Sequence, residues 1–434
     1  MRPTCALVRS MREEPQRPFW LLNAGAVGFA FGTYFCMYAF RKPFAAATFE
    51  GAGFLGLDLK TVYVIAQILG YTASKYIGIR VVTELSRAGR LPLLLGLIAA
   101  AEIALVLFAV VPTPYKVAAL FLNGLPLGMV WGLVVRYLEG RRSSEFLLAG
   151  LSCSFIVASG VVKDVGRWLM TDWGVSEYWM PSAAGAIFLP LFVACALMLN
   201  RTPEPAVADV AERTERAPMT GEARRAFFRR FWPGLVLLML VYLILTAFRD
   251  FRDNYGVELF QELGLGDQRG LFTQTETLVA VGVLALMAAL GWVKQHRRGL
   301  VVLFGIMTFG VLLLGLATLG LKWGLFRGDV WMVLVGLGVY LSYVPFGSFL
   351  FDRIMAATRF TGTAVFAINL ADAVGYSGSV AMQLYKDMFA REASRLEFFI
   401  LLNYVLSVVG AVALLGAGGY FLREARRSGT AVTG

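Results

Sequence analysis

Charged residues are scarce in this sequence of 434 residues. Lysine, arginine, aspartate and glutamate together make up 16% of the chain, whereas hydrophobic residues make up 58%. A soluble protein of this length needs more charge than this to cover its surface. The composition therefore excludes an ordinary soluble domain and favours a protein that lies in the lipid bilayer.

Histidine and cysteine are scarce as well. The one histidine, His296, lies beside cations in a short polar stretch, and the four cysteines are far apart at Cys5, Cys36, Cys153 and Cys195. This spacing does not match a metal site, and no disulfide is needed to stabilise a chain of this kind. We expect the cysteines to be small packing residues, and we expect neither a metal nor a cofactor.

Motifs of the common enzyme classes are missing. The sequence has no Gly-x-x-x-x-Gly-Lys-Ser/Thr loop, no His-Glu-x-x-His helix and no Gly-x-Ser-x-Gly turn. We therefore predict that the protein is not an enzyme, and that any transport runs on a gradient or by exchange.

Apolar segments long enough to cross a bilayer recur along the chain. They fall at 19–48, 61–83, 91–111, 117–138, 146–170 and 180–199, and then at 232–257, 271–293, 299–321, 329–352, 362–388 and 397–422. The residues between the two sets form the one long polar stretch, which is basic and partly amphipathic. The pattern predicts an all-α membrane protein with twelve transmembrane helices in two six-helix halves, 1–200 and 232–434, joined by a cytoplasmic linker, 201–231.

Lysine and arginine are distributed unequally between the two sides of these segments. If the N-terminus is inside, the inner side collects Arg2, Arg9 and the linker arginines, whereas the outer loops keep few cations, among them Lys60 and Lys116. The positive-inside rule then predicts cytoplasmic termini in a protein of the bacterial inner (plasma) membrane. Because this topology accounts for the net charge of +11, we expect no nucleic-acid partner.

Two adjacent cations, Arg41 and Lys42, interrupt the first apolar segment. A cation against lipid costs about 2.5–3.5 kcal/mol, so such residues usually face a bundle interior or a wet cavity. We interpret Arg41 as part of a site for an anion. The alternative is that it marks the outer end of the helix and extends to the lipid headgroups.

The seventh segment repeats this pattern, because Tyr242 precedes Arg249. Many transporters bind their substrate between two repeats, where Arg249 would mirror Arg41. A guanidinium offers a planar pair of donors to phosphate or carboxylate oxygens, and Lys75 would add a third charge.

Ion pairs are the alternative roles for two of these cations. Lys75 would pair with Asp164 or Asp372, and Arg249 would pair with Asp250 or Asp253.

Other ionisable residues in the predicted spans are candidates for coupling or gating, since buried acids can relay protons. They are Asp164, Asp372, Lys163 and Asp250, with Asp372 preferred for a substrate-side or proton-linked role. Glu102 and Glu276 also fall within spans.

Several motifs resemble one known family. Tyr34, Tyr38 and Arg41-Lys42-Pro43-Phe44 are similar to the first-helix signature of the organophosphate:phosphate antiporters, which belong to the major facilitator superfamily. Tyr71-Thr72-Ala73-Ser74-Lys75-Tyr76 resembles their second helix. The fourth and eleventh helices are similar at Phe121-Leu122-Asn123-Gly124, Gly128, Trp131 and Arg136, and at Gly362-Thr363-Ala364 and Gly375-Tyr376.

The resemblance implies the major facilitator fold with a central cavity, and a substrate site made by Arg41, Arg249, Lys75, Tyr34, Tyr38 and Tyr71. The chain departs from the family pattern at Glu84–Arg90, and in the fifth helix, where Lys163-Asp164 replaces the family's histidine.

The predicted function is secondary active transport, by alternating access, of a small anionic metabolite, phosphorylated ones included, in exchange for phosphate. A proton-coupled transporter of another small solute is one alternative. A non-transporting membrane sensor or partner-binding protein with the same fold is another. The expected partners are a small anionic solute and the lipid bilayer, and the expected state is a monomer.

Overall fold

Helices make up most of the described part of the chain. The computed structural model describes residues 19–49, 53, 56–138, 144–203, 221–293, 295–360 and 364–430. The first group of helices comprises α1 (Phe19–Met37), η1 (Tyr38–Phe40), η2 (Pro43–Ala46), α2 (Leu59–Glu84), α3 (Arg87–Val110), α4 (Thr113–Leu138), α5 (Ser144–Thr171) and α6 (Met180–Asn200). The second group comprises α8 (Gly221–Asn254), α9 (Gly256–Glu262), α10 (Leu271–Gly291), α11 (His296–Lys322), α12 (Gly328–Ser348), α13 (Leu350–Thr358), α14 (Ala364–Phe389) and α15 (Arg395–Thr430).

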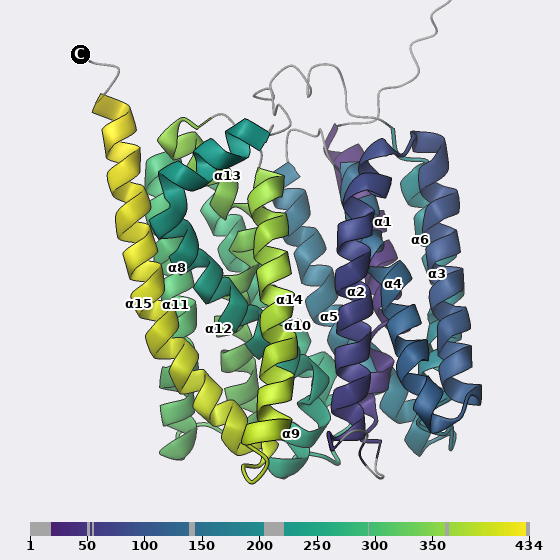
Figure 1. Ribbon diagram of the computed structural model, residues 1–434. Coiled ribbons are helices and arrows are strands. Elements are labelled where there is room, and N and C mark those ends of the chain that lie inside the picture. Colours follow the sequence, from purple (N-terminus) through teal and green to yellow (C-terminus); the bar gives the residue numbers. More distant parts are fainter. Residues whose placement is uncertain are drawn as a thin grey trace, which may run out of the picture.

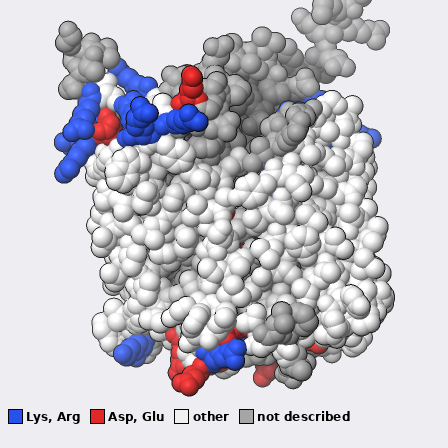
Figure 2. All heavy atoms as spheres, in the orientation of Figure 1, with Lys and Arg blue, Asp and Glu red and all other residues white. Residues whose placement is uncertain are grey.

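The surface of the bundle is that of a membrane protein. Figure 2 shows a wide belt without charged side chains, and the lysines, arginines and acids of this face gather at its two ends. Large apolar side chains on the long helices are exposed, for example Leu278 of α10 and Val408 and Leu415 of α15. Such side chains are stable on a surface that faces lipid.

Each predicted span falls on a helical segment of the described residues. Eight of these helices are long and apolar enough by themselves to cross a bilayer: α3, α4, α6, α8, α10, α11, α12 and α15. Among the others, α2 and α14 carry Lys75 and Asp372, and α5 carries Lys163 and Asp164. Several of the predicted site residues therefore lie on helices that fall short of a simple apolar span, whereas Arg249 and Asp250 lie on α8, which does not.

The buried apolar side chains form two clusters. One draws almost entirely on residues 26–199, and the other draws on residues 227–421 with Cys153 and Ile156. Figure 1 shows the first group of helices on one side of the bundle and most of the second group on the other. The boundaries 1–200, 201–231 and 232–434 stay a prediction, but α8 begins at Gly221 and so extends into the predicted linker.

The groups pack together chiefly through α5 on α10 and α2 on α14. In the first pair a Cβ atom on Gly160 would lie 2.5 Å from the Phe272 carbonyl oxygen, so only glycine allows this approach. The short helix α9 lies at the end of the bundle opposite the C-terminus (Figure 1). We call this the α9 end.

Candidate functional site

Residues of both groups of helices line a cavity of about 70 Å³. The lining residues are Tyr34, Tyr38, Arg41, Tyr71, Lys75, Trp131, Ser152, Phe155, Tyr242, Arg249, Tyr343, Val344, Gly347, Ile368, Asp372 and Tyr376. All six residues that the sequence predicted to bind substrate are among them. Of the coupling candidates, Asp372 lines the cavity as well.

Local hydrogen bonds fix the position of Arg41. Pro43 opens η2 and has no backbone N–H, so the α-helix does not continue through this stretch and two short 3₁₀ turns follow α1. Gln67 of α2 donates to the Arg41 carbonyl oxygen over 2.9 Å and to Asn123 Oδ1 over 2.8 Å. Asn123 of α4 donates in turn to the Phe40 carbonyl oxygen over 3.0 Å. These side chains satisfy the backbone acceptors that the broken helix leaves open.

The guanidinium of Arg41 is buried, and none of the acids in the described part of the chain forms an ion pair with it. The residue is 4% exposed, and its guanidinium carbon lies 3.9 Å from the centre of the Tyr71 ring. Its Nε has no hydrogen-bond partner, and within the described residues no carboxylate pairs with the group. Arg41 lines the cavity, whereas the headgroup alternative would place it at a membrane surface.

The two other cations that line the cavity are paired. Lys75 forms an ion pair with Asp372, which also accepts a hydrogen bond of 2.7 Å from the Tyr242 hydroxyl. Arg249 pairs with Asp250 over 2.7 Å, with its guanidinium carbon 4.3 Å from the centre of the Tyr343 ring. Of the partners that the sequence left open, the structure selects Asp372 for Lys75 and Asp250 for Arg249.

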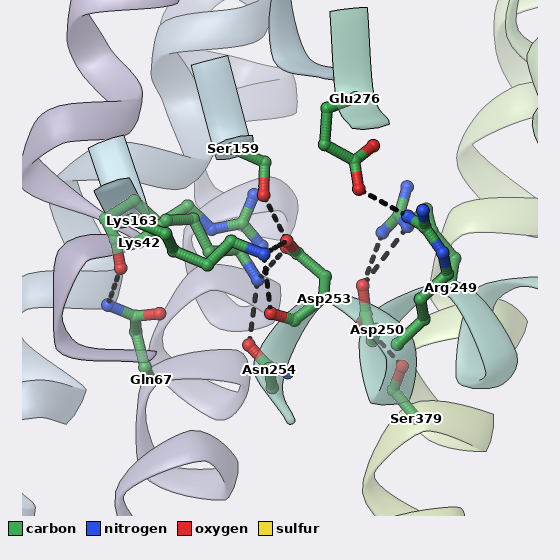
Figure 3. Close-up of polar contacts among 12 residues, drawn as sticks. Lys42, Gln67, Ser159, Lys163, Arg249, Asp250, Asp253, Asn254, Glu276 and Ser379 are labelled. Atoms are coloured by element: carbon green, nitrogen blue, oxygen red, sulfur yellow. Dashed lines mark hydrogen bonds and ion pairs between the residues drawn. The ribbon is translucent and has the colours of Figure 1, made fainter. Parts of the chain in front are cut away.

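A second cluster of charges lies where α8 ends. Figure 3 shows Lys42 and Lys163 converging on Asp253. Lys42 Nζ lies 2.5 Å from Asp253 Oδ2, Lys163 Nζ lies 2.7 Å from Oδ1, and Ser159 donates to the same carboxylate. Lys42 also donates to Asn254 Oδ1 over 2.9 Å. One carboxylate therefore serves two buried lysines from the other group of helices.

Asp164 has a different role from its neighbour Lys163. Its carboxylate accepts hydrogen bonds from the backbone N–H and the hydroxyl of Thr273, over 2.7 and 2.6 Å, and so caps the first turn of α10. Asp164 lines a separate groove of about 490 Å³ between α5 and the start of α10. Neighbouring side chains on a helix point about 100° apart, so Lys163 and Asp164 face different surroundings.

Further contacts between the groups close the α9 end. Lys60 Nζ lies 2.6 Å from Glu258 Oε1, and the hydroxyls of Thr61 and Tyr255 are 2.7 Å apart. Arg395 pairs with Asp58. The expectation that Lys60 lies in an outer loop was wrong, because its side chain is completely buried. Glu258 comes directly after the predicted end of the seventh segment, so its partnership with Lys60 could not be expected.

Sequence reasoning missed some lining residues. Ser152, Phe155 and Tyr343 line the cavity, but each lies in an apolar stretch without a motif. Trp131, in contrast, belongs to the fourth-helix motif. Asp253 was expected only as a partner of Arg249, and the structure gives it two lysines.

Comparison with known proteins identifies the family and the fold. Residues 43–424 match the family described as "Family of unknown function (DUF5690)". No curated protein matches the sequence.

Two solved structures are similar over most of their length. A D-xylose-proton symporter has a TM-score of 0.58 and 14% identity. This match covers 91% of this chain and 96% of the symporter. A mutant of the nucleoside transporter NupG has a TM-score of 0.57 and 12% identity. This match covers 91% of this chain and 98% of the transporter. The likeness confirms the major facilitator fold, while the resemblance to organophosphate antiporters stays a prediction.

Proposed function

Because the chain belongs to the family of unknown function DUF5690 and has the major facilitator fold, we propose that it is a secondary transporter of a small organic anion. The observation that carries the proposal is Arg41. Its guanidinium lines the cavity, is 4% exposed and has no carboxylate partner within the described residues. A buried charge without a counter-charge is costly, and a bound anion would supply the missing partner.

The charges around the cavity support an anion over a cation. The lining holds three cations, Arg41, Lys75 and Arg249, and one acid, Asp372. Even with Asp250, which pairs with Arg249, one positive charge is in excess. The second cluster adds Lys42 and Lys163 against the single carboxylate of Asp253. The medium inside the bundle has a low dielectric constant, so this excess favours a negative solute strongly.

The contacts at the α9 end support alternating access. They join the two groups of helices through Lys60 and Glu258, through Thr61 and Tyr255, and through Lys42 and Asp253. In our proposal these contacts break when the cavity opens to that side. With the predicted cytoplasmic termini, the α9 end faces the outside of the cell. In its more specific form, the proposal is that the anion is a phosphorylated metabolite and that it is exchanged for phosphate.

Proton-coupled transport is the second candidate, and one observation favours it. Asp372 is an acid that lines the same cavity and pairs with Lys75. If Asp372 carries a proton across the membrane, a proton gradient directed into the vesicles drives uptake by wild-type protein but not by Asp372→Asn protein. An exchanger runs equally well without the gradient.

Equilibrium exchange in proteoliposomes tests the main proposal. Vesicles preloaded with one unlabelled anion receive the same labelled anion outside, with phosphate, glycerol 3-phosphate, acetate, benzoate and phenyl phosphate tried in turn. We expect exchange of at least one anion, and we expect Arg41→Ala to reduce it at least about thirtyfold, as the loss of one partner of a buried charge pair does.

A matched control is Arg269→Ala. It removes the same charge from a site that is 85% exposed, where an ion pair contributes little. Exchange should stay within about twofold of wild type. Folded wild-type protein that exchanges none of the anions, or Arg41→Ala protein that exchanges like wild type, would overturn the proposal.

A further inference from the structure

Half of the sixteen residues that line the cavity are aromatic. Two of them, Trp131 and Phe155, have no ionisable group and are only partly buried, although both face the cavity. Side chains in the middle of a packed bundle are normally covered by other side chains. Aromatic surface that stays uncovered in a cavity is typical of a ligand site.

These side chains form a continuous surface with two tyrosines. The ring centres of Tyr34 and Trp131 are 4.8 Å apart, and those of Trp131 and Phe155 are 6.3 Å apart. Phe155 and Tyr38 stack with their centres 6.4 Å apart and their planes 19° from parallel. We call these four side chains the aromatic wall. They come from α1, η1, α4 and α5, so the wall belongs entirely to the first group of helices.

The aromatic wall adjoins the unpaired cation. The guanidinium carbon of Arg41 lies 5.8 Å from the centre of the Tyr38 ring. A solute whose anionic group binds Arg41 therefore has the aromatic wall beside it. The cavity also has a polar part, because Asp372 lines it together with its partners Lys75 and Tyr242.

We propose that the transported solute is a small organic anion that carries a planar ring, with its anionic group on Arg41 and its ring packed against Trp131 and Phe155. This inference rests on the proposed function and specifies its substrate class. Aromatic rings that pack edge-to-face or offset gain affinity beyond the area they bury. A ring therefore improves binding over an anion with the same charged group and no ring.

The cavity must widen before such a solute enters. Its volume is about 70 Å³, whereas a dry cavity that binds benzene has about 150 Å³. The aromatic wall lies in one group of helices, while Tyr242, Tyr343 and Asp372 line the cavity from the other group. Separation of the two groups widens the cavity and leaves the wall intact.

Matched pairs of anions test the inference on the full-length protein in detergent. Phenyl phosphate is compared with methyl phosphate, and benzoate with acetate, by calorimetric measurement of Kd. In the wild type the ring-bearing member of each pair should bind at least about tenfold more tightly. Trp131→Leu and Phe155→Leu keep an apolar side chain. Each should reduce the ratio of the two Kd values within a pair to about threefold or less, and should change the Kd of the ringless anion little.

Two controls separate the wall from other effects. Trp168→Leu removes a tryptophan that is 41% exposed on α5 and lines the separate groove, and it should leave the ratio unchanged. Arg41→Ala should weaken both members of each pair by the same factor.

The outcomes distinguish the two proposals. The ring inference is overturned if all four anions bind and the Kd values within each pair differ by less than twofold. It is also overturned if both leucine variants keep the wild-type ratio of Kd values. In either case the anion-transporter proposal stands. If the folded wild type binds none of the four anions, the ring inference is overturned, and the exchange experiment with phosphate and glycerol 3-phosphate decides the anion proposal separately.

Discussion

Lys75 and Asp372 form an ion pair in the cavity, although they lie 297 positions apart in the chain. The pair joins α2 of the first group to α14 of the second, beside the ring contact between Tyr71 and Tyr376, whose centres are 5.4 Å apart. When the two groups separate, this pair must break, and each residue then needs a new partner. A bound anion provides one for Lys75, so binding and separation are linked.

The pair can be tested by a double-mutant cycle. Asp372→Asn leaves Lys75 without its counter-charge and should lower the unfolding temperature in detergent, as should Lys75→Met. Residues in direct contact are coupled, so the double variant should be more stable than the sum of the single effects predicts, by about 1–3 kcal/mol. Strictly additive effects would show that the contact contributes nothing to the folded state.

Asp253 should be the most sensitive acid of the bundle. Asp253→Asn leaves Lys42 and Lys163 without a carboxylate, and breaking a buried pair in this way costs about 3–5 kcal/mol. We expect a large fall in the unfolding temperature and in the yield of folded protein. Ser159→Ala removes only a hydroxyl from the same carboxylate and should cost about 1 kcal/mol. Equal effects of both substitutions would contradict the role of Asp253 as the shared counter-charge.

Two glycines should respond in opposite ways to alanine. A Cβ on Gly124 of α4 would lie 2.3 Å from the Gln67 carbonyl oxygen of α2, whereas a Cβ on Gly96 of α3 would meet nothing within 4 Å. Gly124→Ala must push α2 and α4 apart and should destabilise the protein by about 1–3 kcal/mol. Gly96→Ala should leave stability unchanged or raise it by up to about 1 kcal/mol, since alanine favours a helix. Thermal unfolding of both variants in the same detergent decides this.

Glu258 should control access to the cavity from the α9 end. In Glu258→Gln protein the ion pair with Lys60 is lost, so the closed arrangement is less stable. A cysteine introduced by Ser152→Cys lines the cavity and reports on access. In sealed vesicles, a membrane-impermeant maleimide added on the side of the α9 end should label it several times faster when Glu258→Gln is also present. Gln261→Ala, which changes an exposed side chain of α9, is the control and should leave the rate as it was.

The sequence predicted the lining of the cavity well because charges in apolar segments are few and expensive. Arg41, Lys75 and Arg249 had to avoid lipid, and a shared cavity was the simplest place for all three. Their partners could not be predicted in the same way. Whether Lys75 pairs with Asp164 or Asp372 depends on α2 packing against α14, which no local pattern specifies.

Other features had no signal in the sequence. Phe155 lies in an apolar helix, where an aromatic residue packs in the core, faces lipid or lines a cavity with the same local pattern. Lys60 comes just before its span and so looked like a loop cation. Its burial depends on Glu258, which lies 198 positions later in the chain. The early start of α8 at Gly221 was hidden because the polar residues of its first turns resemble a linker.

The shared carboxylate of Asp253 has a consequence for how the protein is made. Chains fold from the N-terminus while they are synthesised, and Lys42 and Lys163 are both inserted before the ribosome reaches Asp253. Lys75 likewise precedes Asp372. The first group of helices thus enters the bilayer with lysines whose counter-charges do not yet exist, and it reaches its final packing only after α8 and α14 arrive. Biogenesis of the N-terminal helices is therefore completed by the C-terminal ones.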